Sequence, residues 1–221
     1  MAAPAARLSR GSGAGLILLL PGELILSQLL LDDIRARLAR QKPKKPLLRP
    51  LMRRSAVALI LQLREGESHI LMIKRAEREG DQWSGHMAFP GGRMEEHDAH
   101  GFATAVRETE EEIGLSLDAG DVCIGRLSDK TARPRKGWGM AVSPFVFQLE
   151  REAQLQPNYE VDEVVWVPLS FLLDTANREQ MVWQRRPFSV RLPCYYWEER
   201  CIWGLSLRML DELLGLEGLK P

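Results

Sequence analysis

Four glutamates occupy five consecutive positions of the segment RETEEEIGL, which begins at Arg107. They are Glu108, Glu110, Glu111 and Glu112. Like charges at helical spacing destabilise a helix by roughly 0.2–0.5 kcal/mol per pair. A bound divalent cation would offset this repulsion, which makes the cluster a candidate metal site. The alternative is a solvated acidic surface, the commoner origin of a glutamate-rich helix.

The segment is expected to lie in a helix from about Gly101 to Ile113, because Gly114 is a typical helix end. At 3.6 residues per turn, one apolar stripe is expected to pack on a sheet. The stripe consists of Phe102, Val106, Thr109 and Ile113.

Three of the glutamates share a different face of this helix. Glu108, Glu111 and Glu112 are three or four positions apart, so their side chains are neighbours, whereas Glu110 points elsewhere. Clustered carboxylates are the hard oxygen ligands that Mg²⁺ and Mn²⁺ prefer. The pattern therefore favours a magnesium or manganese site over a zinc site.

A tight turn precedes the helix in the segment AFPGG, which ends a strand-like run. Gly91 and Gly92 follow Pro90, and glycine lets the backbone turn sharply and approach other groups closely. Taken alone, this segment would be an ordinary turn.

Together, the turn and the helix resemble the Nudix box, G-x5-E-x7-R-E-U-x-E-E-x-G-U, where U is bulky and apolar. The second half matches from Arg107 to Leu115, with Thr109 in the first U slot. The first half departs: Gly92 to Arg107 is one residue longer, and the first Glu slot is filled by Asp98 or left empty. The extra residue is a feature of the coenzyme A diphosphatase-like branch of this family.

The resemblance extends over about residues 50–215 and includes GWGMAVSPFVFQL (137–149) and IWGLSLRMLDELL (202–214). Upstream of the box, Arg75 matches the arginine of an Arg-Ser pair in the signature of that branch, but Ala76 stands where the serine would follow. Arg78 is the nearest candidate for a second, displaced arginine.

The resemblance implies hydrolysis of a diphosphate linked to a nucleoside, with Mg²⁺ or Mn²⁺ as cofactor. Glu108 and Glu112 would be the leading metal ligands, and Glu111 a further ligand or a base acting through metal-bound water. Arg107 would orient the carboxylates by charge-assisted hydrogen bonds. The glycines at 91 and 92 would shape the loop that brings backbone to the substrate and metal.

Other candidates stay open at this point. Cations in predicted loops could meet substrate phosphates, but each is more often a solvated surface charge: Arg75, Arg78, Arg133, Arg135 and Lys136. Glu160 or Glu163 could add a carboxylate from a late loop. Trp83 or Trp138 could stack on a base, although tryptophan is more often simply packed.

Composition limits the class of protein. The 221 residues are 45% hydrophobic, enough for a sizeable core, and 30 basic residues balance 30 acidic ones. This balance gives no argument for a nucleic acid or an anionic membrane as partner. Three cysteines without a C-x-x-C motif indicate reduced thiols in a cytosol-like compartment. The sequence permits a homodimer.

The N-terminal part is expected to be an extension. Residues 15–31 are apolar, but Pro21 and Glu23 interrupt them, which argues against a transmembrane span. A short secretory or mitochondrial signal stays open beside a cytoplasmic protein. We expect residues 1–50 to hold a helix (Ser27–Arg40) and a basic, proline-rich linker, and residues 51–221 to form the Nudix domain.

Strands and helices mix without regular β-α alternation, which favours an α+β fold with a mixed sheet packed between helices, an α/β/α sandwich. Strands are predicted at residues 55–64, 69–75, 121–127, 140–149, 163–169 and 188–197, and a last helix at 203–216.

Three functions fit the sequence. The first is hydrolysis of coenzyme A or its esters. The second is hydrolysis of another nucleoside diphosphate derivative, such as ADP-ribose, a dinucleotide, a nucleotide sugar or a damaged nucleotide. The third is an inactive Nudix fold that binds a ligand, which the intact carboxylate cluster argues against.

Overall fold

The computed structural model describes residues 21–80, 83–117, 122–132, 139–185 and 188–219. The first 20 residues lie outside these ranges, as do four candidate binding residues: Arg133, Arg135, Lys136 and Trp138.

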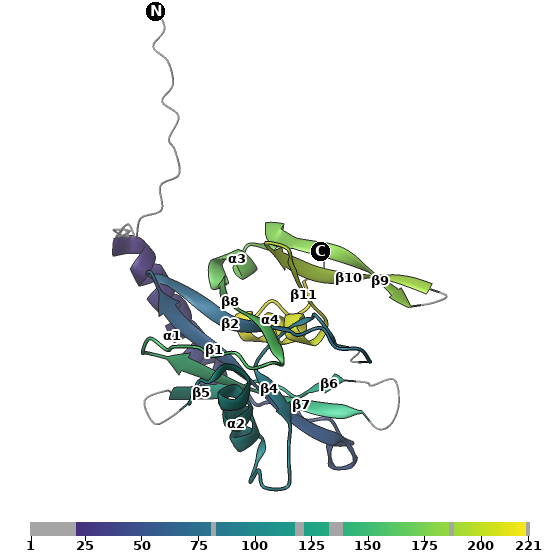
Figure 1. Ribbon diagram of the computed structural model, residues 1–221. Coiled ribbons are helices and arrows are strands. Elements are labelled where there is room, and N and C mark those ends of the chain that lie inside the picture. Colours follow the sequence, from purple (N-terminus) through teal and green to yellow (C-terminus); the bar gives the residue numbers. More distant parts are fainter. Residues whose placement is uncertain (1–20, 81–82, 118–121, 133–138, 186–187, 220–221) are drawn as a thin grey trace, which may run out of the picture.

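Within the described residues, eight strands form one mixed sheet (Figure 1). They are β1 (Arg53–Arg64), β2 (Glu67–Arg75), β3 (Met87–Ala88), β4 (Gly91–Arg93), β5 (Val122–Arg126), β6 (Lys130–Ala132), β7 (Met140–Leu149) and β8 (Val161–Pro168). The main path is β3-β2-β1-β7-β5, with β4 paired to β1, β6 to β7 and β8 to β2. β1 and β7 run parallel, and the other pairs are antiparallel. The predicted mixed sheet is confirmed.

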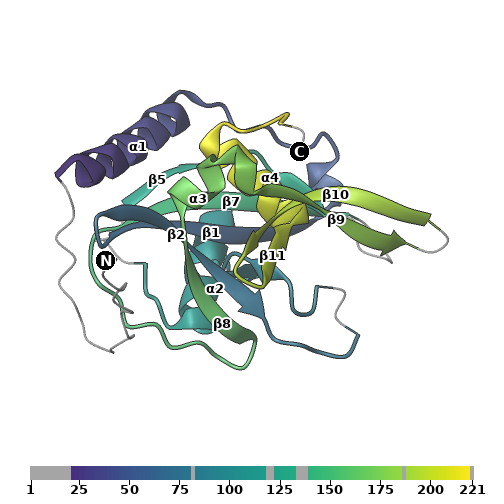
Figure 2. The same ribbon diagram turned by 90° about the horizontal axis from the view of Figure 1, so that it is seen from above.

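Helices cover both faces of this sheet. They are α1 (Pro21–Arg40), α2 (Gly101–Ile113), α3 (Leu169–Leu173) and α4 (Gly204–Leu214), with short 3-10 turns at Arg49–Leu51 and Thr175–Asn177. Alternation along β1 explains the layers, because successive side chains point to opposite faces. Ala58 and Ile60 join the core under α2. Leu59 and Leu61 join the core shared with α1 and α4 (Figure 2), and the predicted α+β sandwich is confirmed.

The predicted packing face of α2 is partly wrong. Thr104, Ala105, Thr109 and Ile113 are buried, but Phe102 is 36% exposed. Small side chains let the helix approach the sheet closely, while Phe102 lies at the helix edge with its ring 5.7 Å from that of Phe145. The helix bounds themselves are confirmed.

A second sheet of three strands projects from the body (Figure 1) and has the order β11-β10-β9. It comprises β9 (Arg178–Arg185), β10 (Phe188–Trp197) and β11 (Arg200–Trp203). Two bonds from Arg178 to Asp211 of α4, at 2.7 and 2.9 Å, tie it to the main body. Only β10 was predicted, because β9 carries many charged and polar residues and β11 is only four residues long.

The N-terminal helix begins at Pro21, earlier than the predicted Ser27. Its residues Leu31, Ile34 and Leu38 are buried in the main core. Among the described residues, no helix combines the length and apolarity needed to cross a membrane.

Candidate active site

The turn at Pro90 and the short strand β4 that follows it are bound tightly to β1. Ala58 N donates to Pro90 O at 2.8 Å, and Ser55 Oγ donates to Gly92 O at 2.5 Å. Gly91 has φ 151°, and a Cβ added to it would lie 2.3 Å from Ala56 O. Only glycine fits at this position, because the obstructing atom belongs to the backbone of the central strand.

The carboxylate of Glu108 lies directly against this turn. A Cβ added to Gly92 would be 2.3 Å from Glu108 Cδ, so the absent side chain leaves the space that the carboxylate fills. Arg107 Nη2 is 3.0 Å from Glu108 Oε1. Burial raises the pKa of Glu108, and the charge of Arg107 opposes that rise.

Glu112 is the most buried carboxylate of the cluster, with 3% of its surface exposed. Its Oε2 accepts a hydrogen bond from Gly91 N at 2.8 Å. Burial raises the pKa of Glu112 to about 7, and the charges of Glu108 and Glu160 add to that rise. The Gly91 N–H and the charge of Arg75 oppose it. Glu112 is therefore a buried acid with other carboxylates close by.

Arg107 holds the helix and the turn together. Its Nε and Nη2 donate to Asp98 at 3.1 and 2.9 Å, and its Nη1 donates to Glu111 at 2.8 Å. The bonds from Arg107 hold the pKa of Asp98 well below its usual range. The sequence left open whether Asp98 fills the first Glu slot of the box. In the structure Asp98 anchors Arg107. The side chain of Glu111 is 54% exposed and turned toward Arg107.

The loop before β8 brings one further carboxylate to the cluster. Asn158 Nδ2 donates to Glu111 O at 2.8 Å, and its backbone N donates to Glu112 O at 2.8 Å. Glu160 N in turn donates to Asn158 Oδ1 at 2.7 Å. One asparagine therefore ties the last turn of α2 to the segment that carries Glu160.

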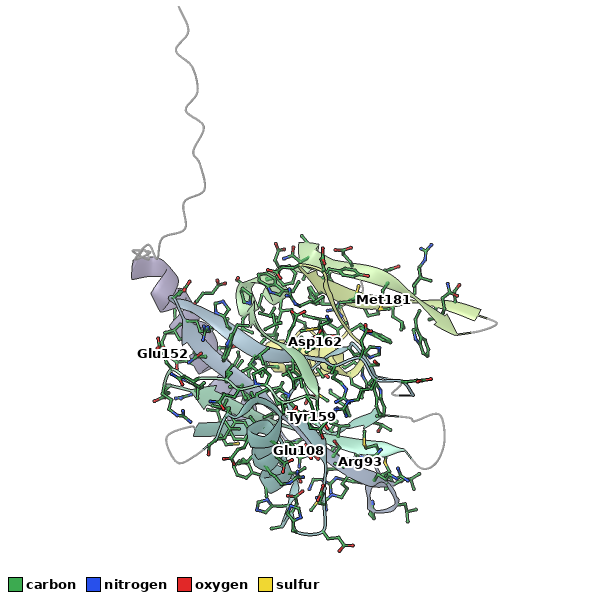
Figure 3. All side chains as sticks on the ribbon, in the orientation of Figure 1. Arg93, Glu108, Glu152, Tyr159, Asp162 and Met181 are labelled. Carbon is green, nitrogen blue, oxygen red and sulfur yellow. The ribbon has the colours of Figure 1, made fainter. Side chains whose placement is uncertain are left out.

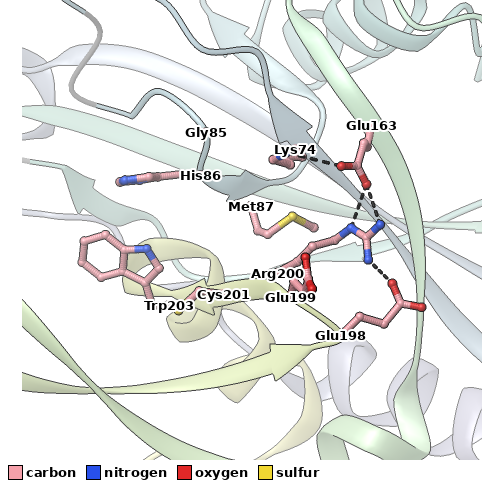
Figure 4. A pocket seen from close by; sticks show the side chains of 10 residues that line it. All are labelled: Lys74, Gly85, His86, Met87, Glu163, Glu198, Glu199, Arg200, Cys201 and Trp203. Carbon is pink, nitrogen blue, oxygen red and sulfur yellow. Dashed lines mark hydrogen bonds and ion pairs between the residues drawn. The ribbon is translucent and has the colours of Figure 1, made fainter.

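The other late glutamate lies elsewhere. Glu163 Oε2 accepts from Arg200 Nε at 2.8 Å, and its Oε1 is 3.3 Å from Lys74 Nζ. It lines a separate cavity of about 590 Å³ (Figure 4). Of the two late glutamates left open by the sequence, Glu160 is the one that lies near Glu108 and Glu112.

The carboxylates open onto a cleft of about 2130 Å³. Trp83 and the predicted cations Arg75 and Arg78 line it. Arg78 Nη1 is 3.3 Å from Glu160 Oε1, and its guanidinium lies 4.8 Å from the centre of the Tyr159 ring.

Three further lining residues carry no sequence motif and were missed: Arg93, Asn158 and Tyr159. Arg93 and Tyr159 line the same cleft as Glu108, and all three are labelled in Figure 3. Two tryptophans from the three-stranded sheet were missed as well, Trp183 and Trp203. Each of these five residues reaches the cleft only through packing between distant segments, so no local sequence pattern predicts its position there.

The chain is similar to known proteins over most of its length. It matches the family model described as NUDIX domain over residues 52–192. It is 30% identical over 202 residues to the uncharacterized Nudix hydrolase NudL of Citrobacter koseri, covering 88% of this chain and 98% of that protein. It is 33% identical over 143 residues to an uncharacterized Schizosaccharomyces pombe protein, covering 55% of this chain and 43% of that relative's length.

A crystal structure of a MutT/nudix family protein from Enterococcus faecalis is also similar, with TM-score 0.48 and 15% identity over 83% of this chain and 66% of that one. The family match covers the turn, α2 and the loop that bears Glu160. The chain thus belongs to the Nudix hydrolase family.

Proposed function

We propose that this protein hydrolyses the diphosphate linkage of a nucleoside diphosphate derivative, using Mg²⁺ or Mn²⁺. The preferred substrate is coenzyme A or one of its esters, cleaved to 4′-phosphopantetheine and adenosine 3′,5′-bisphosphate. The observation that carries the proposal is the pairing of Glu108 and Glu112 at the wall of a cleft that also contains arginines. The choice of coenzyme A rests on the sequence resemblance of residues 137–149 and 202–214 to the coenzyme A diphosphatase-like branch of the family.

The donor set suits a divalent cation. Among the residues described, no three His, Cys, Asp or Glu side chains form a ready-made metal cluster. Mg²⁺ does not need one, because it keeps several waters and binds through one or two carboxylates plus substrate phosphates. Glu108 and Glu112 supply two such carboxylates. A cation there would offset the burial and the carboxylate repulsion that together raise the pKa of Glu112.

Each residue then has a role. Glu108 and Glu112 would hold the cation, which would supply neutralisation of phosphate charge and a lowered pKa of water. Glu160 accepts the proton of the attacking water. Two observations support this role: Glu160 lines the cleft, and its charge raises the pKa of both Glu108 and Glu112. Glu111, bound to Arg107, helps to position that arginine. Arg75 and Arg78 bind substrate phosphates.

Asn158→Ala tests the placement of Glu160. The change removes a donor to Glu111 O and the acceptor of Glu160 N, so a loss of about 1–3 kcal/mol in stability is expected. If Asn158 acts through Glu160, kcat falls and KM changes little. In a Glu160→Gln background the same mutation should then lower kcat no further. Full additivity of the two effects on kcat would contradict a positioning role.

A substrate panel tests the proposed function. Coenzyme A, dephospho-coenzyme A, ADP-ribose, NADH, diadenosine polyphosphates, UDP-glucose and 8-oxo-dGTP are incubated with Mg²⁺, Mn²⁺ or EDTA, and products are resolved by mass. We expect turnover to require a divalent cation and to favour coenzyme A over its dephospho form. Arg75→Ala should remove that preference, because the 3′-phosphate needs a cation.

Other outcomes would change the assignment. A preference of about tenfold in kcat/KM for ADP-ribose or a nucleotide sugar, or about 1.4 kcal/mol of transition-state discrimination, favours the second function. Equal rates in EDTA would contradict the metal site. Ligand binding without any turnover would favour an inactive binding module.

A further inference from the structure

The cleft continues past the carboxylates to an uncharged end formed by the C-terminal part of the chain. Of the described residues from position 183 onward that line the cleft, none is charged: Trp183, Gln184, Trp203, Gly204, Leu205, Ser206 and Met209. The family match ends at residue 192, before β11 and α4. This end of the cleft is therefore built largely by residues outside the matched Nudix domain.

Three aromatic rings gather at this end. The rings of Trp183 and Trp203 are 6.2 Å apart between centroids and inclined at 46°, and His86 contacts Trp203 edge-on at 5.0 Å. Figure 4 shows His86 and Trp203 near each other at the edge of the smaller cavity. Since both residues also line the cleft, they separate the two spaces. Trp203 thus contacts two other rings, those of His86 and Trp183.

Trp183 is a partly exposed member of this group. It lies on the edge strand β9, and 37% of its surface is exposed. Its neighbour Gln184 is also exposed to the cleft and carries both a hydrogen-bond donor and an acceptor. A partly exposed indole beside an amide suits a flat, neutral heteroaromatic ring better than a flexible aliphatic chain.

We propose that Trp183 and Trp203 form a stacking subsite for the nucleobase of the substrate. The proposal rests on the proposed function for the identity of that substrate, and it extends it by placing the base at the end of the cleft formed by β9, β11 and α4. The phosphates then lie toward Arg75 and Arg78, which belong to the charged end: Arg75 lowers the pKa of Glu112, and Arg78 binds Glu160.

Binding of AMP in EDTA tests the subsite without requiring hydrolysis. Trp183→Leu and Trp203→Leu keep an apolar side chain but remove the π face. Trp166→Leu is the matched control, because Trp166 stacks with Arg64 and does not line the cleft. Titration calorimetry should give an AMP Kd at least about tenfold higher for both subsite variants, since stacking on an aromatic ring contributes substantially to base binding. Ribose 5-phosphate should bind all four proteins equally.

Two results would overturn the subsite: unchanged AMP affinity in Trp183→Leu, or equal affinity of the wild-type protein for AMP and ribose 5-phosphate. Selective loss of binding to hexanoyl-pantetheine instead of AMP would assign this end to an acyl chain and overturn it as well. Trp183 is exposed, so its variant stays informative even if Trp203→Leu lowers the melting temperature. AMP binding that depends on Trp183, without turnover of any substrate, would contradict the proposed function and support the subsite. Turnover together with AMP binding that does not depend on Trp183 would support the proposed function and contradict the subsite.

Discussion

Glu112→Gln is expected to lower kcat by about three orders of magnitude while leaving the protein folded. The charge stabilisation from a bound metal amounts to several kcal/mol, and each 1.36 kcal/mol corresponds to about tenfold in rate. Glutamine keeps an oxygen that can accept from Gly91 N, so the turn stays in place. Steady-state kinetics with saturating Mg²⁺ measure the loss. Glu110→Gln is the matched control, since Glu110 is exposed on the same helix.

Although Glu112→Gln should lower kcat, it should make the metal-free protein more stable at high pH. Burial raises the pKa of Glu112 from 4.5 to about 7 in the folded protein. A carboxyl group with a raised folded pKa favours the fold while protonated, so its contribution is present below pH 4.5 and lost as pH rises through about 7. Wild-type protein in EDTA should therefore lose melting temperature over this interval.

Glu112→Gln cannot ionise, so its melting temperature in EDTA should fall less over the same pH range and exceed that of the wild type near pH 8. Glu110→Gln should follow the wild type. Melting curves of wild type and Glu112→Gln that stay parallel at every pH would show that Glu112 is not the group responsible. Added Mg²⁺ should raise the melting temperature of the wild type most at high pH, where Glu112 is ionised.

The elements that could be predicted from the sequence are those with local signals. The helix 101–113 and the strands 140–149 and 188–197 agree with α2, β7 and β10 at both ends. Their capping glycine and apolar runs are contiguous in the chain. β9 and β11 were missed because each finds its stability through pairing with β10, and a pattern within one strand does not report its partner.

The site was predictable in composition but not in geometry. A helical wheel places Glu111 and Glu112 on the same face, yet of these two only Glu112 is buried. The turn at Gly91 covers Glu112, whereas Glu111 stays exposed beside Arg107. The roles of Asp98 and Asn158 could not be predicted from the sequence, for a related reason. Their function lies in contacts to Arg107 and to the end of α2, which exist only once separate segments meet.

Gly92→Ala is expected to fold and to lose about 100-fold or more in kcat. The added Cβ would fall 2.3 Å from Glu108 Cδ, so the flexible carboxylate must move. Displacing a group at the reaction centre by about 1 Å can cost 100-fold in rate. Gly91→Ala differs, because its Cβ would meet backbone at Ala56 O and disrupt the sheet itself. Circular dichroism and steady-state kinetics separate the two results.

The cause of the Gly92→Ala defect can be isolated with a second mutation. If the alanine acts by displacing Glu108, then adding it to a Glu108→Ala protein should change kcat little, because the displaced carboxylate is already gone. Gly101→Ala serves as the control, since its Cβ would lie 3.5 Å from the Phe145 ring, an ordinary contact. A full 100-fold loss from Gly92→Ala in the Glu108→Ala background would mean that Gly92 acts on catalysis by another route, through the backbone of the turn rather than through the carboxylate it makes room for.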